Sequence, residues 1–154
     1  MNIQTKILTI VFTIIITSCT GTKPMLGKIE NTLSPCPDKP NCVSSQSQDQ
    51  SHYVEPFHYT GSQQMAFDQL VFIIRQFPRT QITKQTENYL HVEFKSAWFG
   101  FIDDVEFLFS SAQQIQVRSA SRIGYSDFGV NRKRINSIRA KFEKASLGTN
   151  TNDV

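Results

Sequence analysis

The sequence is poor in cysteine and has no hydrophobic run long enough to cross a bilayer. Three cysteines among 154 residues are too few for a disulfide-dense scaffold or for a zinc site with four thiolates. The longest apolar run, residues 7–16, is far shorter than the roughly 20 residues that span a membrane. The chain also lacks the Gly-x-Gly-x-x-Gly, P-loop, Gly-x-Ser-x-Gly and His-Glu-x-x-His motifs, and no metal-ligand spacing links its three histidines, His52, His58 and His91. We therefore expect no catalytic residue, no cofactor and no metal.

The excess of positive charge is also small. The formal net charge is +3, which gives no reason to expect nucleic acid as a partner. A chain of 154 residues, 39% of them hydrophobic, has the size of one domain and enough apolar side chains to form a core.

The N-terminus has the features of a processing signal. Lys6 precedes the apolar run, which is followed by Thr17-Ser18-Cys19, an ending that resembles the lipobox of bacterial lipoproteins. We expect residues 1–18 to be a lipoprotein signal peptide and Cys19 to carry acyl chains, because two or more chains anchor a protein stably to a membrane. Thr20, in place of Asp, then favours the outer membrane, with the domain facing the periplasm. The alternative is an ordinary secreted protein that is cleaved elsewhere.

Irregular segments lie on both sides of the regular part of the chain. Residues 19–34 have no hydrophobic period and predict a tether between the lipid and the domain. Residues 35–52 begin with three prolines in six residues, which disfavour a helix or a central strand, and predict a surface loop. Residues 147–154 predict a disordered tail. A single domain is therefore expected over residues 35–146.

Hydrophobic periodicity predicts two helices and five strands. Apolar residues at i, i+3, i+7 and i+10 predict helices over residues 62–77 and 131–145. Alternating apolar and polar residues predict strands over 53–60, 80–86, 89–97, 104–110 and 114–119. The expected fold class is α+β, with the order β-α-β-β-β-β-α and both helices on one face of an antiparallel sheet of about five strands. The other face is polar and is either solvated or used for binding.

Three motifs carry a resemblance to a known family. They are Pro35-Cys36-Pro37-Asp38-Lys39-Pro40-Asn41-Cys42-Val43-Ser44-Ser45, residues 99–107 (FGFIDDVEF) and residues 118–131 (RSASRIGYSDFGVN). In this order they resemble the signatures of the domain-of-unknown-function family 1499, over residues 33–145. The resemblance implies a bacterial envelope protein or lipoprotein and no established activity. The order of elements also resembles the topology of the TATA-binding protein, an analogy that implies no DNA function.

Cys36 and Cys42 lie in a segment expected in an oxidising compartment. Three states remain open for them: a structural disulfide, two free or buried thiols, or a redox-active pair. The spacing differs from the Cys-x-x-Cys of thiol oxidoreductases, and no lysine or histidine adjoins either thiol to lower its pKa.

Charge is distributed unevenly in the second half of the chain. Residues 118–144 carry a local charge of +6, and residues 87–106 carry −4. Arg132, Lys133 and Arg134 fall in the first turn of the last predicted helix, where the helix dipole disfavours cations by about 0.3–1 kcal/mol each. Either ion pairs inside the fold offset them, or an anionic or polar ligand does. The predicted pocket for such a ligand consists of Arg118, Ser119, Ser121, Arg122, Tyr125, Asp127, Asn131 and Arg132.

Trp98, Phe99 and Phe101 surround Gly100 in a predicted turn. They either pack on the rim of the core or form an exposed patch for a partner or for lipid.

These features favour a lipid-anchored protein of the bacterial envelope that binds without catalysing a reaction. The expected partners are the membrane, through the lipid anchor, and an anionic small molecule, a glycan or an envelope protein. Three alternatives remain: a thiol redox enzyme that uses Cys36 and Cys42, an unrecognised hydrolase, and an envelope assembly factor that uses residues 98–101.

Overall fold

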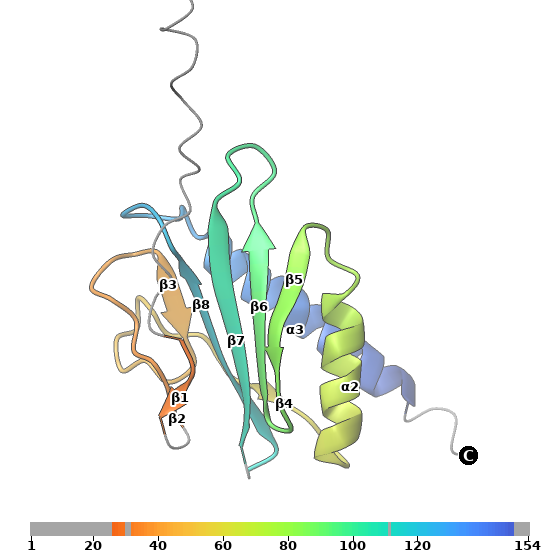
Figure 1. The fold of residues 1–154 in the computed structure, drawn as a ribbon. Helices are drawn as coiled ribbons and strands as arrows, with labels where there is room; N and C mark the ends of the chain where they lie inside the picture. The colour runs from red at the N-terminus through yellow and green to blue at the C-terminus, as the bar shows by residue number, and fades with distance from the viewer. Residues whose placement is uncertain (1–25, 30–31, 111, 150–154) are drawn as a thin grey trace, which may run out of the picture.

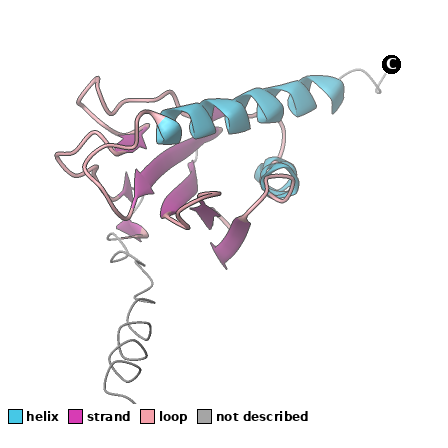
Figure 2. Cartoon of the chain, turned by 90° about the horizontal axis from the view of Figure 1, so that it is seen from above, coloured by secondary structure: helices cyan, strands magenta, loops and turns pink. Residues whose placement is uncertain are grey.

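The protein folds as an α+β domain, which confirms the predicted class. The computed structural model describes residues 26–29, 32–110 and 112–149. An antiparallel sheet of six strands, one more than predicted, has two helices packed on one face (Figures 1 and 2). Its strands are β3 (Cys42–Ser44), β4 (Phe57–His58), β5 (Thr80–Gln85), β6 (Tyr89–Lys95), β7 (Ile102–Ser110) and β8 (Gln114–Ser121). The helices are α2 (Gln63–Ile74) and α3 (Val130–Thr149).

Strands β6, β7 and β8 form a meander at the centre of the sheet. Val92 of β6 lies opposite Val105 of β7, and Phe107 lies opposite Val117 of β8. Because side chains alternate along a strand, these apolar residues all face the helices. They pack against Leu70 of α2 and against the apolar stripe of α3 in one buried core.

The helices differ from the prediction mainly at their ends. The Ser62 hydroxyl accepts a hydrogen bond from the Met65 amide at 3.2 Å and caps α2. Helix α2 ends at Ile74, three residues before the predicted end, and Phe77 packs on the core from the loop that follows. Helix α3 continues to Thr149, so the predicted tail begins inside the helix.

The predicted surface loop 35–52 contains a strand. In β3, Cys42, Val43 and Ser44 are all buried, and the strand pairs with β8 from Cys42↔Ala120 to Ser44↔Arg118. The three prolines constrain only the segment before this strand, and three residues are too few to show a period. Strand β4 is also short and covers only two of the residues predicted over 53–60. It pairs with β8 at Phe57↔Ile115, so β3 and β4 share one edge of β8.

The predicted tether contributes to the domain. Strands β1 (Lys28–Ile29) and β2 (Thr32–Leu33) form a small antiparallel ladder. Leu33 is buried in a cluster with Tyr89 and Leu108, whose side chains point away from the helices. Strands of two residues are too short to show a hydrophobic period, which is why the sequence predicted a tether here. The predicted signal peptide, Cys19 and the rest of the tether lie outside the described residues.

In the parts of the chain that the structure describes, neither helix has the length and apolar character needed to cross a bilayer.

Candidate functional site

The face of the sheet away from the helices carries buried ion pairs. Arg118 Nη1 lies 3.0 Å from Glu106 Oε2, and both side chains are at most 2% exposed. The Tyr89 hydroxyl donates to Glu106 Oε1 at 2.7 Å, and the Gly27 amide donates to the same oxygen at 2.8 Å. Burial and the Glu106 carboxylate raise the pKa of the Tyr89 hydroxyl, which stays a donor. Glu106 therefore connects β6, β7, β8 and the N-terminal segment.

A second cluster lies on the same face, centred on Asp104. Arg122 donates to both carboxylate oxygens of Asp104, each at 2.7 Å, and also pairs with Glu93. His91 Nε2 lies 2.7 Å from Asp104 Oδ1. Burial raises the pKa of Asp104, but the hydrogen bonds from Arg122 and His91 outweigh it and lower the pKa below its usual value. The carboxylates of Asp104 and Glu93 raise the pKa of Arg122. Asp104 and Arg122 are therefore both charged throughout the neutral range.

A polar cluster on the helix side joins β8 to α3. Asn131 is fully buried and accepts a hydrogen bond from the Ser119 hydroxyl at 2.5 Å. Its amide nitrogen donates to the Asn41 carbonyl at 3.0 Å and to Ser121 Oγ at 3.1 Å. Arg134 pairs with Asp103 at 2.5 Å and donates to Asn131 Oδ1 at 2.6 Å. These contacts fix the start of α3 against the sheet.

Two of the three cations at the start of α3, Arg132 and Arg134, are offset from within the protein, whereas Lys133 is exposed. Asp127 accepts hydrogen bonds from the Gly129 and Asn131 amides at 2.9 and 2.7 Å and caps the helix. Arg132 donates to the carbonyl oxygens of Tyr53 and Ser51 at 2.6 and 2.7 Å.

The eight residues of the predicted pocket do not line one cavity. Arg118 and Arg122 lie on the face away from the helices, whereas Ser119, Ser121 and Asn131 face the helices. Asp127 and Arg132 both line a small cavity of about 200 Å³. The eighth, Tyr125, is 70% exposed. Carboxylates already pair with the guanidiniums of Arg118 and Arg122, so the ion-pair alternative describes these two cations.

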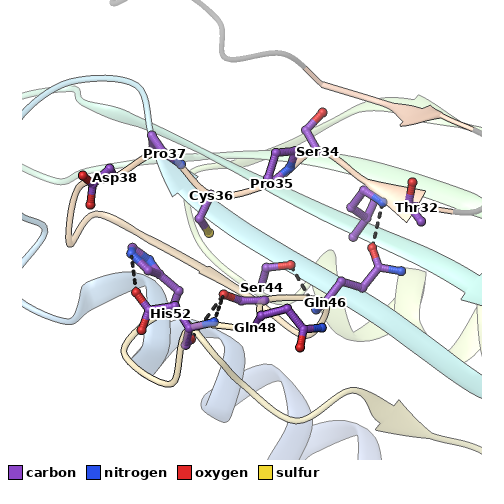
Figure 3. Close-up of a pocket in the computed structure, with 13 residues that line it drawn as sticks. Thr32, Ser34, Pro35, Cys36, Pro37, Asp38, Ser44, Gln46, Gln48 and His52 are labelled. Carbon is purple, nitrogen blue, oxygen red and sulfur yellow. Dashed lines mark hydrogen bonds and ion pairs between the residues drawn. The ribbon is translucent and has the colours of Figure 1, made fainter.

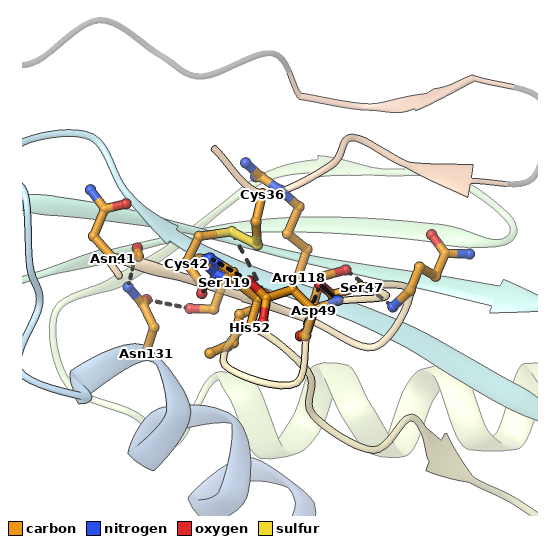
Figure 4. Close-up of a disulfide and its surroundings, with 12 residues drawn as sticks. Cys36, Asn41, Cys42, Ser47, Asp49, His52, Arg118, Ser119 and Asn131 are labelled. Atoms are coloured by element: carbon orange, nitrogen blue, oxygen red, sulfur yellow. Dashed lines mark hydrogen bonds and ion pairs between the residues drawn. A yellow bond between two sulfur atoms is a disulfide. The ribbon is translucent and has the colours of Figure 1, made fainter. Parts of the chain in front are cut away.

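Cys36 and Cys42 lie at disulfide-bonding distance, with their Cα atoms 5.6 Å apart (Figure 4). The bridge closes the proline-rich turn and joins β2, through residues 34–36, to β3. Cys42 is only 3% exposed, and Arg118 lies beside the bridge on the same face of the sheet (Figure 4). The disulfide therefore holds the proline-rich turn on the face of the sheet that carries the buried ion pairs.

A cavity of about 500 Å³ opens beside Cys36 of this bridge (Figure 3). Four apolar residues line it, and the other nine lining residues are polar. The apolar ones are Leu33, Pro35, Cys36 and Pro37, and the polar ones are Thr32, Ser34, Asp38, Ser44, Gln46, Ser47, Gln48, Asp49 and His52.

Hydrogen bonds shape the floor of this cavity. Gln46 Oε1 accepts from the Leu33 amide at 2.8 Å, which fixes β2 to the loop after β3. The Gln46 amide donates to Ser44 Oγ at 3.2 Å. Asp49 Oδ1 accepts from the amide and hydroxyl of Ser51, and these bonds lower the pKa of Asp49. Asp49 is thus ionised at neutral pH.

A hydrogen bond to the backbone fixes the orientation of the His52 ring at the cavity. Its Nδ1 lies 2.8 Å from the Cys42 carbonyl oxygen, which only accepts hydrogen bonds, so Nδ1 carries a proton. In the neutral ring Nε2 is then an acceptor, and it lies 3.8 Å from Asp49 Oδ2. This distance is too long for a direct hydrogen bond and leaves Nε2 available to a ligand hydroxyl.

Gln46, Ser47, Gln48 and Asp49 are not among the residues that the sequence predicts to bind a ligand. The one sequence feature that could have indicated these residues is that they form a polar run directly after the first family motif. In the structure this run lines the same cavity as the motif residues 35–38 and Ser44. Of the three histidines, only His52 lines this cavity.

The fold and the site define a small α+β domain with a bridged turn beside a polar cavity and a charged face closed by its own N-terminal segment. A family model described as a protein of unknown function, DUF1499, matches residues 32–142, and the chain belongs to that family. This confirms the resemblance carried by the three motifs. Comparisons with curated proteins and with solved structures gave no match.

We expect Glu106→Ala to lower the free energy of unfolding by about 3–5 kcal/mol, because it leaves Arg118 buried without its partner. The double variant Glu106→Leu with Arg118→Met should lose less free energy of unfolding than the single variant Glu106→Leu. Urea denaturation measures both, with Glu87→Ala, at an exposed position, as the control. Equal losses for the double variant and for Glu106→Leu would contradict a buried ion pair.

The lowered pKa of Asp104 predicts how the stability of the protein depends on pH. A carboxyl whose pKa is lowered by folding stabilises the native state above its unfolded pKa of about 3.9 and loses that contribution as the pH falls through its folded pKa. Asp104→Asn should be less stable at pH 7 and should lose less stability than the parent protein on acidification below about pH 4. Thermal melts across this range measure the difference, and parallel curves for the two proteins would contradict it.

Proposed function

We propose that this protein is anchored by lipid in the bacterial cell envelope and binds a neutral, hydroxyl-rich ligand, a glycan, without catalysing a reaction. The observation that carries the ligand class is the cavity beside the disulfide. Its lining has nine polar side chains, among them two carboxylates, and no lysine or arginine.

This lining suits sugar hydroxyls better than an anion. Hydroxyl, amide, carboxylate and imidazole groups offer both donors and acceptors, as a ligand that carries adjacent hydroxyl groups requires. The apolar side chains of Leu33, Pro35 and Pro37 provide contact area for the nonpolar face of a sugar ring. Asp38 and Asp49 would repel an anionic group at the same place.

The buried ion pairs weigh against an anionic ligand at the arginines. An anion at Arg118 or Arg122 has to displace Glu106 or Asp104 from a buried site, and each displaced carboxylate loses a charged partner. A glycan at the cavity requires no such rearrangement. The proposal thus keeps the glycan class and places it away from the eight residues of the predicted pocket.

The envelope location rests on the sequence. The basic residue, the apolar run and the lipobox at Cys19 predict lipidation, and Thr20 favours the outer membrane facing the periplasm. A disulfide agrees with that compartment. The correspondence to the topology of the TATA-binding protein stays a prediction and adds no DNA-binding role to the proposal.

A thiol redox function has less support from the sequence. The spacing differs from the Cys-x-x-Cys of thiol oxidoreductases, and no lysine or histidine adjoins either cysteine to activate it, even though Cys36 lines the cavity and only Cys42 is almost fully buried. The bridge is better explained by its effect on the cavity, since it holds Cys36 and its neighbouring prolines over Ser44.

The ligand class is tested by calorimetric titration of the protein with neutral oligosaccharides, for example chitotetraose and maltotetraose, and with inorganic phosphate. We expect binding of a neutral oligosaccharide, loss of that binding in Gln48→Ala and Asp38→Ala, and none of phosphate. Both substituted side chains are exposed, so the fold should tolerate their removal. Gln81→Ala, on exposed β5, is the matched control. Phosphate binding that survives Gln48→Ala and Asp38→Ala, with no saccharide binding, would contradict the proposal.

A further inference from the structure

Two loops of the domain meet at one end of the sheet. Residues 96–101 connect β6 to β7, and residues 122–129 connect β8 to α3. Asp103, at the start of β7, lies opposite Ser121, at the end of β8, and the Arg122 amide donates to the Ile102 carbonyl at 3.1 Å. Both loops therefore project beyond the same end of the strands, at the top of Figure 1.

Large hydrophobic side chains are exposed at this end. Eight such side chains are exposed among the described residues, and six of them belong to these two loops or to the first residue of α3. We call this group the aromatic end; it consists of Trp98, Phe99, Phe101, Tyr125, Phe128 and Val130. Trp98 is 92% exposed and Phe128 is 89% exposed, so neither packs on the rim of the core. Phe99 and Phe101 stack on each other, with ring centroids 5.4 Å apart.

Phe128 is held in a conformation that its residue type disfavours. Its φ is +53°, in the left-handed region where glycine or asparagine is favoured and a bulky residue is strained. Asp127 helps to fix this turn by accepting the Gly129 and Asn131 amides. Because the phenyl ring is exposed, the strain is not offset by core packing. A strained residue with no packing role points to a contact outside the domain.

The N-terminal segment leads toward the same end. Gly27 is bonded to Glu106, and Leu33 packs on Leu108, further from the start of β7. Because β1 and β2 are antiparallel and Lys28 lies opposite Leu33, the chain followed backward along β1 to Gly27 moves from the level of Leu108 to that of Glu106, and so toward the aromatic end. Cys19 and Leu26 are seven positions apart in the sequence, a separation that spans at most about 25 Å in an extended chain. An acyl group on Cys19 thus keeps this end of the domain within reach of the bilayer.

The side chains around the aromatic end suit a lipid surface. Tryptophan, tyrosine and phenylalanine partition to the interface between headgroups and acyl chains. The exposed cations Lys95 and Lys133 lie beside the two loops, and the Lys95 side chain lies 3.2 Å from where a Cβ on Gly100 would be. Cations near an anionic membrane surface add to such binding.

We propose that the aromatic end docks on the bilayer surface that holds the lipid anchor, so that the domain lies against the membrane in a fixed orientation. This inference rests on the proposed anchoring at Cys19. The disulfide and the glycan cavity are then held at a defined height above the surface, since β1 and β2 are part of the domain.

The only tryptophan of the chain, Trp98, reports directly on docking. The full chain is expressed in a bacterial host, purified and reconstituted into vesicles of phosphatidylethanolamine and phosphatidylglycerol, with and without brominated acyl chains. We expect brominated lipid to quench Trp98 emission at least about twofold, as for an indole at the interface. The matched reporter is Trp98→Phe with Met65→Trp, because Met65 is 68% exposed at the start of α2, away from the two loops. It should not be quenched.

Phe128→Asn separates docking from folding. Asparagine tolerates the left-handed conformation, so the melting temperature should stay the same or rise, while the quenching of Trp98 should fall. Unquenched Trp98 in the parent protein overturns lipid docking and leaves the aromatic end to a protein partner. Quenching that Phe128→Asn leaves unchanged overturns the role of Phe128.

The intact mass of the same sample reports on anchoring separately. An acyl adduct on Cys19 with unquenched Trp98 overturns docking and keeps the proposed anchoring. Quenching of Trp98 without an adduct overturns the anchoring and supports docking by the aromatic end itself.

Discussion

The structure depends on how charge is neutralised on the face of the sheet away from the helices. Glu106 accepts hydrogen bonds from Arg118, Tyr89 and the Gly27 amide, and all three partners come from different segments. Burying a carboxylate and a guanidinium is costly unless their hydrogen bonds are satisfied. The N-terminal segment supplies one of those bonds and covers part of the face that the helices do not, over Tyr89, Glu106 and Leu108. This part of the sheet is thus covered on both sides.

This closure decides where a ligand has room. Arg118 and Arg122 are held by carboxylates, and the helix start is capped by Asp127, so the positive residues of the second half of the chain mainly hold the fold together. The open polar space lies instead where the N-terminal segment, the bridged turn and the loop after β3 meet. If the N-terminus is also the lipid anchor, the anchor, the cavity and the aromatic end are all tied to one rigid sheet.

The regular half of the fold was predictable because its elements are long enough to show a period. The stripes containing Leu70 and Ile138 predicted both helices, and the alternation around Val92 predicted the central meander. Strand β3 and the β1–β2 ladder have two or three residues each, so their place depends on partners far away in the sequence. Periodicity has no access to that information.

The charges were predictable in number but not in pairing. The sequence showed a positive and a negative stretch, which left ion pairs and a ligand pocket as alternatives. Which arginine meets which carboxylate follows from register, since Arg118 lies opposite Glu106 only in the observed pairing of β7 with β8. The cavity was missed for a related reason. It is built from a polar run and a proline-rich turn that come together only through β3.

Hydrogen exchange at the Gly27 amide tests the central claim most directly, since its acceptor is the carboxylate that organises the second face. The account predicts slow exchange at Gly27, comparable to that of amides in β8, together with protection of the Leu33 amide bonded to Gln46. Exchange of both amides at the rate of an unstructured peptide would show that the N-terminal segment does not close this face, and would contradict the account.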